Sequence, residues 1–97
     1  MKPSDALQRY RVDIRRIVEQ NGAGNARVFG CAVHGNDTLG SDLELIVDPL
    51  DKEAALACAA RIKVEVEALT GTETEIVTPM DLPKRCLRAV LAEAVPV

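Results

Sequence analysis

Two acidic residues and a glycine turn have the residue types and the spacing of a possible chemical site in this sequence. Asp42 and Glu44 stand two positions apart in DLELIV, where acidic and apolar residues alternate as they do along a β-strand. The alternation places both carboxylates on one face, about 6–7 Å apart, where they repel each other unless a cation lies between them. We interpret the pair as a metal site that the Gly30-Cys31 turn faces.

The elements that must position these residues follow from the hydrophobic pattern. A first helix is predicted between a cap at Ser4 and a break at Asn21-Gly22, because apolar residues there recur at spacings of three and four. The Ala32–Ser41 connection has room for a single short turn of helix. The predicted strands are Arg27–Gly30, Asp42–Val47 and Thr72–Thr78. Two further helices are expected from Asp48-Pro49 to Thr70-Gly71 and from about Asp81 to Ala94, the last with Leu87, Val90, Leu91 and Ala94 facing inward.

The lengths of the connections predict how the strands pair. Only about a dozen residues separate the first strand from the second, which suits an antiparallel pair. A helix joins the second strand to the third, which suits a right-handed parallel crossover and brings Glu75 beside Asp42 and Glu44. The expected fold is a small α/β domain, with a mixed sheet of three to four strands and helices packed mainly on one side.

Each of these residues also has an ordinary interpretation. Asp42 and Glu44 could form the solvated face of an edge strand, and Glu75 could be a surface acid. Cys31 is interpreted as a structural or phosphate-turn residue rather than a catalytic thiol, because no nearby His-Asp constellation supports a nucleophile. His34, the only histidine, is interpreted as a turn or substrate-facing residue rather than a metal ligand.

Length and composition limit the class of protein. The 97 residues, 1–97, make one domain with a single modest core. Hydrophobic residues make up 47%, but only one Phe, one Tyr and no Trp are among them, so stability is expected to lean on a partner or a homo-oligomer interface. The formal net charge of −3 argues against a nucleic-acid binder held by phosphate contacts.

The cysteines and the apolar segments indicate where the protein works. The three cysteines are odd in number and lack CxxC or Cys/His zinc spacing, which is typical of reduced thiols. No apolar run approaches the ~18 residues of a membrane span, and the first residues lack the apolar core of a signal peptide. We expect a soluble, cytoplasmic protein with no membrane partner.

The motif residues resemble those of the DNA polymerase β-like nucleotidyltransferases. That motif is a Gly-Ser pair, ten residues, then Asp-x-Asp, with a third acid on a later strand. The chain is similar to the minimal nucleotidyltransferase domains of this superfamily, many of which are antitoxins paired with HEPN-domain toxins. The segments that carry the resemblance are FGCAVHGNDTLGSDLELIVDP, TEIVTP and VLAEAVPV.

The resemblance implies a fold, a reaction and a set of site residues. It implies the polymerase β-like nucleotidyltransferase fold and the Mg²⁺-dependent transfer of AMP from ATP to a hydroxyl of a HEPN-type toxin. The implied nucleotide-binding residues are Gly30, Cys31 and Ser41. The implied catalytic and metal-binding residues are Asp42, Glu44 and Glu75, the last of which could also help to deprotonate the attacking hydroxyl.

Three departures from the motif leave a second function open. Cys31 replaces the serine, and Glu44 and Glu75 stand where aspartate is usual. Each glutamate keeps the charge but moves its oxygens by one methylene, roughly 1.2–1.5 Å. A misplacement of 1 Å can cost a factor on the order of 100 in rate. The alternative is therefore a catalytically degenerate domain that neutralises its toxin by binding alone.

Overall fold

A four-stranded mixed sheet lies at the centre of the computed structural model, which describes all residues from Met1 to Val97. The strands are β1 (Ala23–Phe29), β2 (Leu43–Pro49), β3 (Thr74–Val77) and β4 (Val95–Pro96). They lie in the order β3-β2-β1-β4. β2 pairs antiparallel with β1 and parallel with β3, as predicted, and β4 adds an antiparallel edge strand beside β1.

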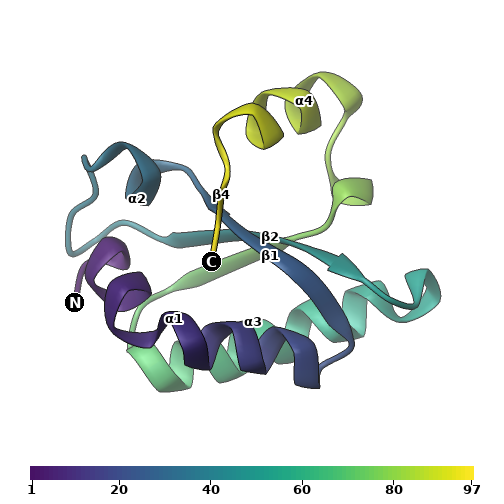
Figure 1. Ribbon diagram of the computed structural model, residues 1–97, viewed down its shortest axis with the longest axis horizontal. Coiled ribbons are helices and arrows are strands. Elements are labelled where there is room, and N and C mark those ends of the chain that lie inside the picture. The colour runs from purple at the N-terminus through teal and green to yellow at the C-terminus, as the bar shows by residue number, and fades with distance from the viewer.

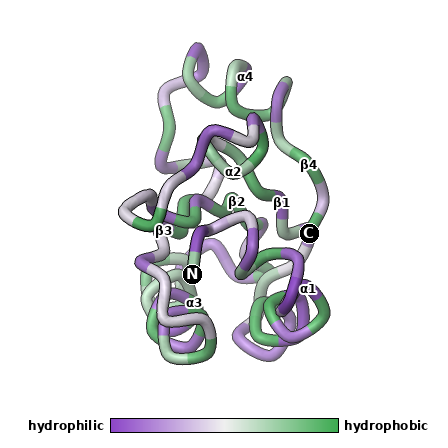
Figure 2. The backbone as a smooth tube through the Cα atoms, turned by 90° about the vertical axis from the view of Figure 1, so that its left-hand side faces the viewer, coloured by the Kyte–Doolittle hydropathy of each residue, from purple (hydrophilic) through white to green (hydrophobic).

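Helices flank this sheet unequally. The helices are α1 (Pro3–Gln20), α2 (Cys31–His34), α3 (Ala55–Thr70) and α4 (Lys84–Glu93), with 3₁₀ turns η1 (Lys52–Ala54) and η2 (Pro79–Asp81). α1 and α3 lie side by side against one face, whereas α4 stands on the opposite side (Figures 1 and 2). The single-turn α2 fills the predicted short connection between β1 and β2.

The hydrophobic core lies between the sheet and the α1/α3 layer. Leu43, Leu45 and Val47 of β2 are fully buried and belong to this core. Ile14 of α1 and Ile62 of α3 meet them from the helices, also with no exposed surface. Each such side chain contributes about 1.5–3 kcal/mol by leaving water. Because these apolar residues fix which face of β2 is inward, they direct Glu44 to the opposite face.

The last helix differs from its prediction. It begins at Lys84 instead of Asp81, because Pro79–Asp81 forms a separate 3₁₀ turn. None of its residues is buried: Leu87 and Val90 are half-buried and Leu91 is 41% exposed. α1 and α3 already cover the core face, and α4 lies beyond the other face between two extended segments (Figure 1). The prediction that this stripe faces inward was therefore wrong for Leu91, and the other three residues are only half-buried.

α3 is apolar on both sides. Cys58, Ile62 and Val66 face the core, while Leu56 and Val64 on the outer side are 86% and 64% exposed. Leu56, Ala60 and Val64 recur every four residues and so share one face. We call these three residues the outer stripe of α3. No helix has the length and apolar character needed to span a membrane.

Candidate functional site

The Gly30 turn follows β1 and lies in direct contact with Glu44. Gly30 has φ 80° and ψ −152°, a backbone region that is essentially restricted to glycine. A Cβ atom built at Gly30 would also overlap the Glu44 carboxylate. Phe29, the residue before the turn, is the register partner of Glu44 across β1 and β2. The backbone conformation therefore favours glycine, and a larger residue here would displace the end of the Glu44 side chain.

Two of the three predicted acids lie side by side. Glu44 and Glu75 are register partners on the parallel strands β2 and β3, which run about 4.8 Å apart. Glu44 is half-buried and Glu75 is exposed, and no ion pair joins either of them to a lysine or arginine. Asp42 is exposed one residue before β2, which begins at Leu43, one residue later than predicted.

The carboxylates interact electrostatically. Burial raises the pKa of Glu44 above its usual value, and the charges of Glu75, Asp42 and Glu93 raise that pKa further. A cation at this point would relieve the repulsion, and hard carboxylate oxygens are the ligands that Mg²⁺ prefers. The donor set thus fits a divalent ion. In the present side-chain conformations no three acidic, histidine or cysteine groups are arranged around one position, so the metal-binding role of these acids stays a prediction.

The other two predicted nucleotide-binding residues have different surroundings. Cys31 is the first residue of α2 and its free thiol is exposed beside the turn. The Ser41 hydroxyl accepts a 2.9 Å hydrogen bond from the Thr38 backbone N–H and lies 3.3 Å from the Thr38 hydroxyl. Ser41 therefore closes a turn over residues 38–41. The nucleotide-binding roles of Cys31 and Ser41 stay predictions.

Glu93 joins the site although no local pattern in the sequence indicates it. Its Oε1 accepts a hydrogen bond from the Gly30 N–H at 3.4 Å, and its Oε2 lies 2.9 Å from His34 Nε2. The hydrogen bond from His34, followed by that from Gly30, lowers the pKa of Glu93. These contacts span 63 and 59 residues of the chain, so only the strand order could have revealed them. His34 is the last residue of α2 rather than a turn residue, and Glu93 is its partner.

Asp37 is a second residue that the sequence did not single out. It is only 8% exposed, and its carboxylate accepts hydrogen bonds from the Ser4 N–H at 2.7 Å and the Ser4 hydroxyl at 3.1 Å. The Ser4 N–H contributes most to lowering the pKa of Asp37. This contact ties the loop between α2 and β2 to the start of α1. The loop leads directly to Asp42, so Asp37 helps to position the acidic site.

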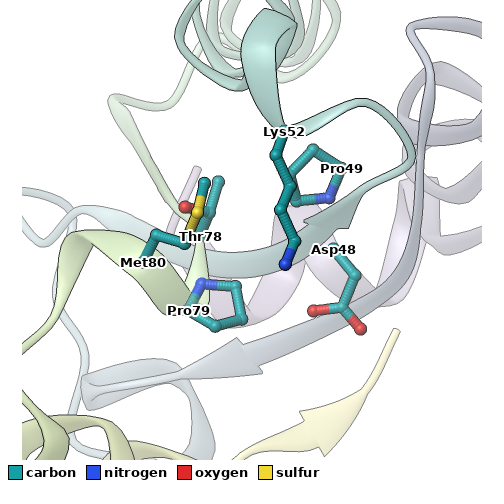
Figure 3. Close-up of a pocket in the computed structure, with 6 residues that line it drawn as sticks. All are labelled: Asp48, Pro49, Lys52, Thr78, Pro79 and Met80. Carbon is teal, nitrogen blue, oxygen red and sulfur yellow. The ribbon is translucent and has the colours of Figure 1, made fainter.

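A surface pocket of about 250 Å³ lies at the other end of β2 and β3 (Figure 3). It is lined by Asp48, Pro49, Lys52, Thr78, Pro79 and Met80. The charge of Asp48 is already engaged, because its carboxylate accepts hydrogen bonds from Arg27 at 2.7 Å and Asn25 at 2.8 Å. Glu44 stands four residues earlier, roughly 13 Å along the strand. The pocket is therefore separate from the acidic site.

The acidic site lies at the end of the sheet where β1 finishes and β2 and β3 begin. A glycine turn touches an acid on the next strand, and a second acid lies in register beside it, as expected from the resemblance to nucleotidyltransferases. Comparison with solved structures agrees. One protein, described as a "putative minimal nucleotidyltransferase", superposes with a TM-score of 0.85 and 32% sequence identity over 97% of this chain and 95% of its own. This chain therefore belongs to the minimal nucleotidyltransferase family.

A second solved structure shares the fold at greater distance. It is a crystal structure described as a toxin-antitoxin with AMP-PNP, with a TM-score of 0.67 and 14% identity. The match covers 84% of this chain and 66% of that one, and at this identity it shows the fold alone. No protein-family model and no curated protein matches the sequence.

Proposed function

We propose that this protein is a Mg²⁺-dependent nucleotidyltransferase that transfers AMP from ATP to a hydroxyl of a HEPN-type toxin, and so acts as an antitoxin. The contact of Glu44 with Gly30, together with the register pairing of Glu44 and Glu75, carries the proposal. Membership of the minimal nucleotidyltransferase family supports the reaction class. The likeness to a toxin-antitoxin with AMP-PNP supports ATP and a toxin as partners, and the HEPN class of toxin rests on the sequence resemblance.

The proposed reaction is a single displacement at phosphorus. The oxygen of the toxin hydroxyl forms a bond to the α-phosphorus of ATP. The bond from that phosphorus to the oxygen bridging to the β-phosphate breaks, and pyrophosphate leaves with the electron pair. The hydroxyl proton passes to the Glu75 carboxylate, which is exposed at the start of β3 and so accessible to a large acceptor.

Each site residue has a part in holding the reactants. Asp42, Glu44 and Glu75 would hold Mg²⁺, which supplies positive charge next to the phosphate oxygens. Gly30 lets the chain pass close to the phosphates and offers its backbone N–H as a donor. Cys31 contributes less than serine would, because a thiol is a weak hydrogen-bond donor. Glu44 is the most constrained acid, since it packs against the Gly30 turn.

The alternative function is neutralisation of the toxin by binding alone. The longer side chains of Glu44 and Glu75 favour it, because they shift the carboxylate oxygens relative to aspartate. The outer stripe of α3 also favours it, because exposed apolar residues that share one helix face are typical of protein-binding surfaces. Both functions require a protein partner, and only the first requires ATP.

Label transfer separates the two functions. The chain would be incubated with the toxin, Mg²⁺ and ATP labelled at the α-phosphorus, with ATP labelled at the γ-phosphorus as the control. We expect label on the toxin from the first ATP only, and none with Glu44→Gln. Binding of the toxin without label from either ATP would establish the alternative. A combined Cys31→Ser, Glu44→Asp and Glu75→Asp variant that gains activity would show that the natural site is degenerate.

A further inference from the structure

Glu93 makes the only side-chain hydrogen bonds between α4 and the rest of the protein. One carboxylate oxygen meets the Gly30 N–H at 3.4 Å, and the other meets His34 Nε2 at 2.9 Å. Lys84, Arg85 and Arg88 of α4 are exposed and form no ion pair. A negatively charged group of the protein itself therefore lies at the turn that is proposed to receive phosphates.

Apart from the pairing of β4 with β1, which begins two residues after Glu93, little else holds α4 in place. No residue of this helix is buried, and in two perpendicular views the helix stands apart from the sheet on two extended segments (Figures 1 and 2). Leu91 is 41% exposed. Few apolar contacts oppose a movement of α4, which is the property expected of a segment that opens at low cost in free energy.

We propose that Glu93 is a displaceable latch, and that a phosphate group of the nucleotide takes the place of its carboxylate at Gly30 and His34. This proposal rests on the proposed function only in assuming that polyphosphate binds at the Gly30 turn. In the ligand-free protein Glu93 holds α4 down beside the acidic site. When a phosphate arrives, the Gly30 N–H and the His34 imidazole donate to the phosphate instead, and α4 is released.

Glu93 and a phosphate group cannot occupy Gly30 and His34 at the same time, because both are negatively charged. A carboxylate and a phosphate both accept hydrogen bonds from N–H groups, and two anions on the same donors repel each other. Glu93 also adds to the negative charge that already surrounds Glu44. The exchange leaves both donors satisfied, because a phosphate oxygen replaces each carboxylate oxygen. The His34 side chain is 53% exposed, so an incoming ligand can reach it.

The first test measures the affinity for inorganic tripolyphosphate in the presence of Mg²⁺ by calorimetry. This probe contains the phosphates of ATP but cannot donate AMP. Glu93→Gln removes the competing charge and keeps the shape of the side chain, so we expect binding to tighten by on the order of five-fold. The matched control is Glu19→Gln, which removes a charge from the exposed end of α1 and should leave the affinity unchanged. Weaker or unchanged binding in Glu93→Gln, or no binding by either protein, would overturn the latch.

The second test measures hydrogen–deuterium exchange of the α4 amides. Tripolyphosphate should speed exchange across Lys84–Glu93 in the natural chain, and Glu93→Gln should show the faster exchange without ligand. Exchange that stays equal in all four samples would contradict the proposal. Neither test depends on AMP transfer: if transfer fails while tripolyphosphate frees α4, only the proposed function is wrong. If transfer proceeds while Glu93→Gln changes neither affinity nor exchange, only the latch is wrong.

Discussion

Glu44 both packs against the Gly30 turn and lies at the centre of the negative charge of the site. It is half-buried against the Gly30 turn and has no cationic partner, while Glu75, Asp42 and Glu93 all add negative charge around it. Isolated and half-buried carboxylates cost folding free energy unless they are paired. The arrangement therefore lowers the stability of the free chain, and the proposed cation would offset that cost.

Gly30→Ala tests the contact between the turn and Glu44. The substitution forces a left-handed backbone on alanine and drives its Cβ into the Glu44 carboxylate. We expect a loss of about 1–3 kcal/mol in the free energy of unfolding, and loss of ATP binding. Gly40→Ala is the matched control, because a Cβ there meets open space and no positive φ is involved. Similar losses in both variants, measured by urea unfolding, would show that Gly30 has no special role.

Glu44→Gln tests the cost of the unpaired charge. The pKa of Glu44 is raised above its usual value of 4.5, so ionised Glu44 is less favourable in the folded than in the unfolded chain. The stability associated with this group is present below pH 4.5 and is lost as the pH rises through the folded-state pKa. Glu44→Gln should therefore melt at a higher temperature than the natural chain at pH 7, in EDTA. The difference should vanish near pH 4, and an equal melting temperature at both pH values would contradict the electrostatic account.

At the scale of elements, the loop from Gly35 to Ser41 decides where Asp42 lies. Asp37 fixes this loop to the N-terminus of α1 through two hydrogen bonds to Ser4, and Ser41 closes its last turn through Thr38. The position of the acidic site therefore depends on Asp37 and Thr38, which contribute no side chain to the predicted site.

Asp37→Asn and Ser4→Ala test this anchor as a pair. Each single substitution should lower the melting temperature and weaken the binding of Mg²⁺-ATP, because the loop that leads to Asp42 is released. Ser4→Ala removes only the hydroxyl hydrogen bond and keeps the Ser4 N–H donor, so it should cost less than Asp37→Asn, and the double variant should lose little more than Asp37→Asn alone. Strictly additive losses in a double-mutant cycle would show that the two residues act separately.

The sequence predicted those elements in which one face is apolar and the other is polar. In β2 the alternation of buried and acidic residues fixes the register, and the parallel crossover then brings Glu75 beside Glu44. β1 was predicted to begin at Arg27, because Gly24-Asn25 was expected to break the chain between the helix and the strand. It begins at Ala23, because the pairing of β1 with β2 continues past Gly24 and Asn25 with a shift of register. The apolar stripe of α4 indicated which side of the helix is apolar, but not which part of the protein that side contacts. The contact of Glu93 with Gly30 depends on the return of the chain to β1 through β4, which two residues are too short to signal.

At the scale of the whole molecule, one helix divides its apolar residues between the core and the surface. α3 supplies Ile62 to the core, and its outer stripe of Leu56, Ala60 and Val64 remains exposed. The core contains no tryptophan and few large side chains. α3 therefore contributes to the stability of the free chain through its inner face, and its outer face is available to a protein partner.

Substitutions on the outer face of α3 should affect toxin binding, whereas a substitution on the inner face should affect the free energy of unfolding. Leu56→Gln together with Val64→Gln should change the free energy of unfolding by no more than about 0.5 kcal/mol per residue. Ile62→Ala on the inner face should cost about 2–5 kcal/mol. If the outer stripe binds the toxin, the paired glutamine variant loses toxin binding at unchanged stability. A large loss of stability in that variant would show that the outer stripe is part of the folded core.

Intact-mass spectrometry of the toxin tests the central claim most directly, because it identifies the transferred group without a label. The toxin would be incubated with this protein, ATP and Mg²⁺, beside a parallel reaction with Glu44→Gln. We predict that the toxin gains the mass of one or more AMP groups with the natural chain and none with Glu44→Gln. A toxin that binds the natural chain and loses its activity while its mass stays unchanged would contradict the claim that this acidic site transfers nucleotides.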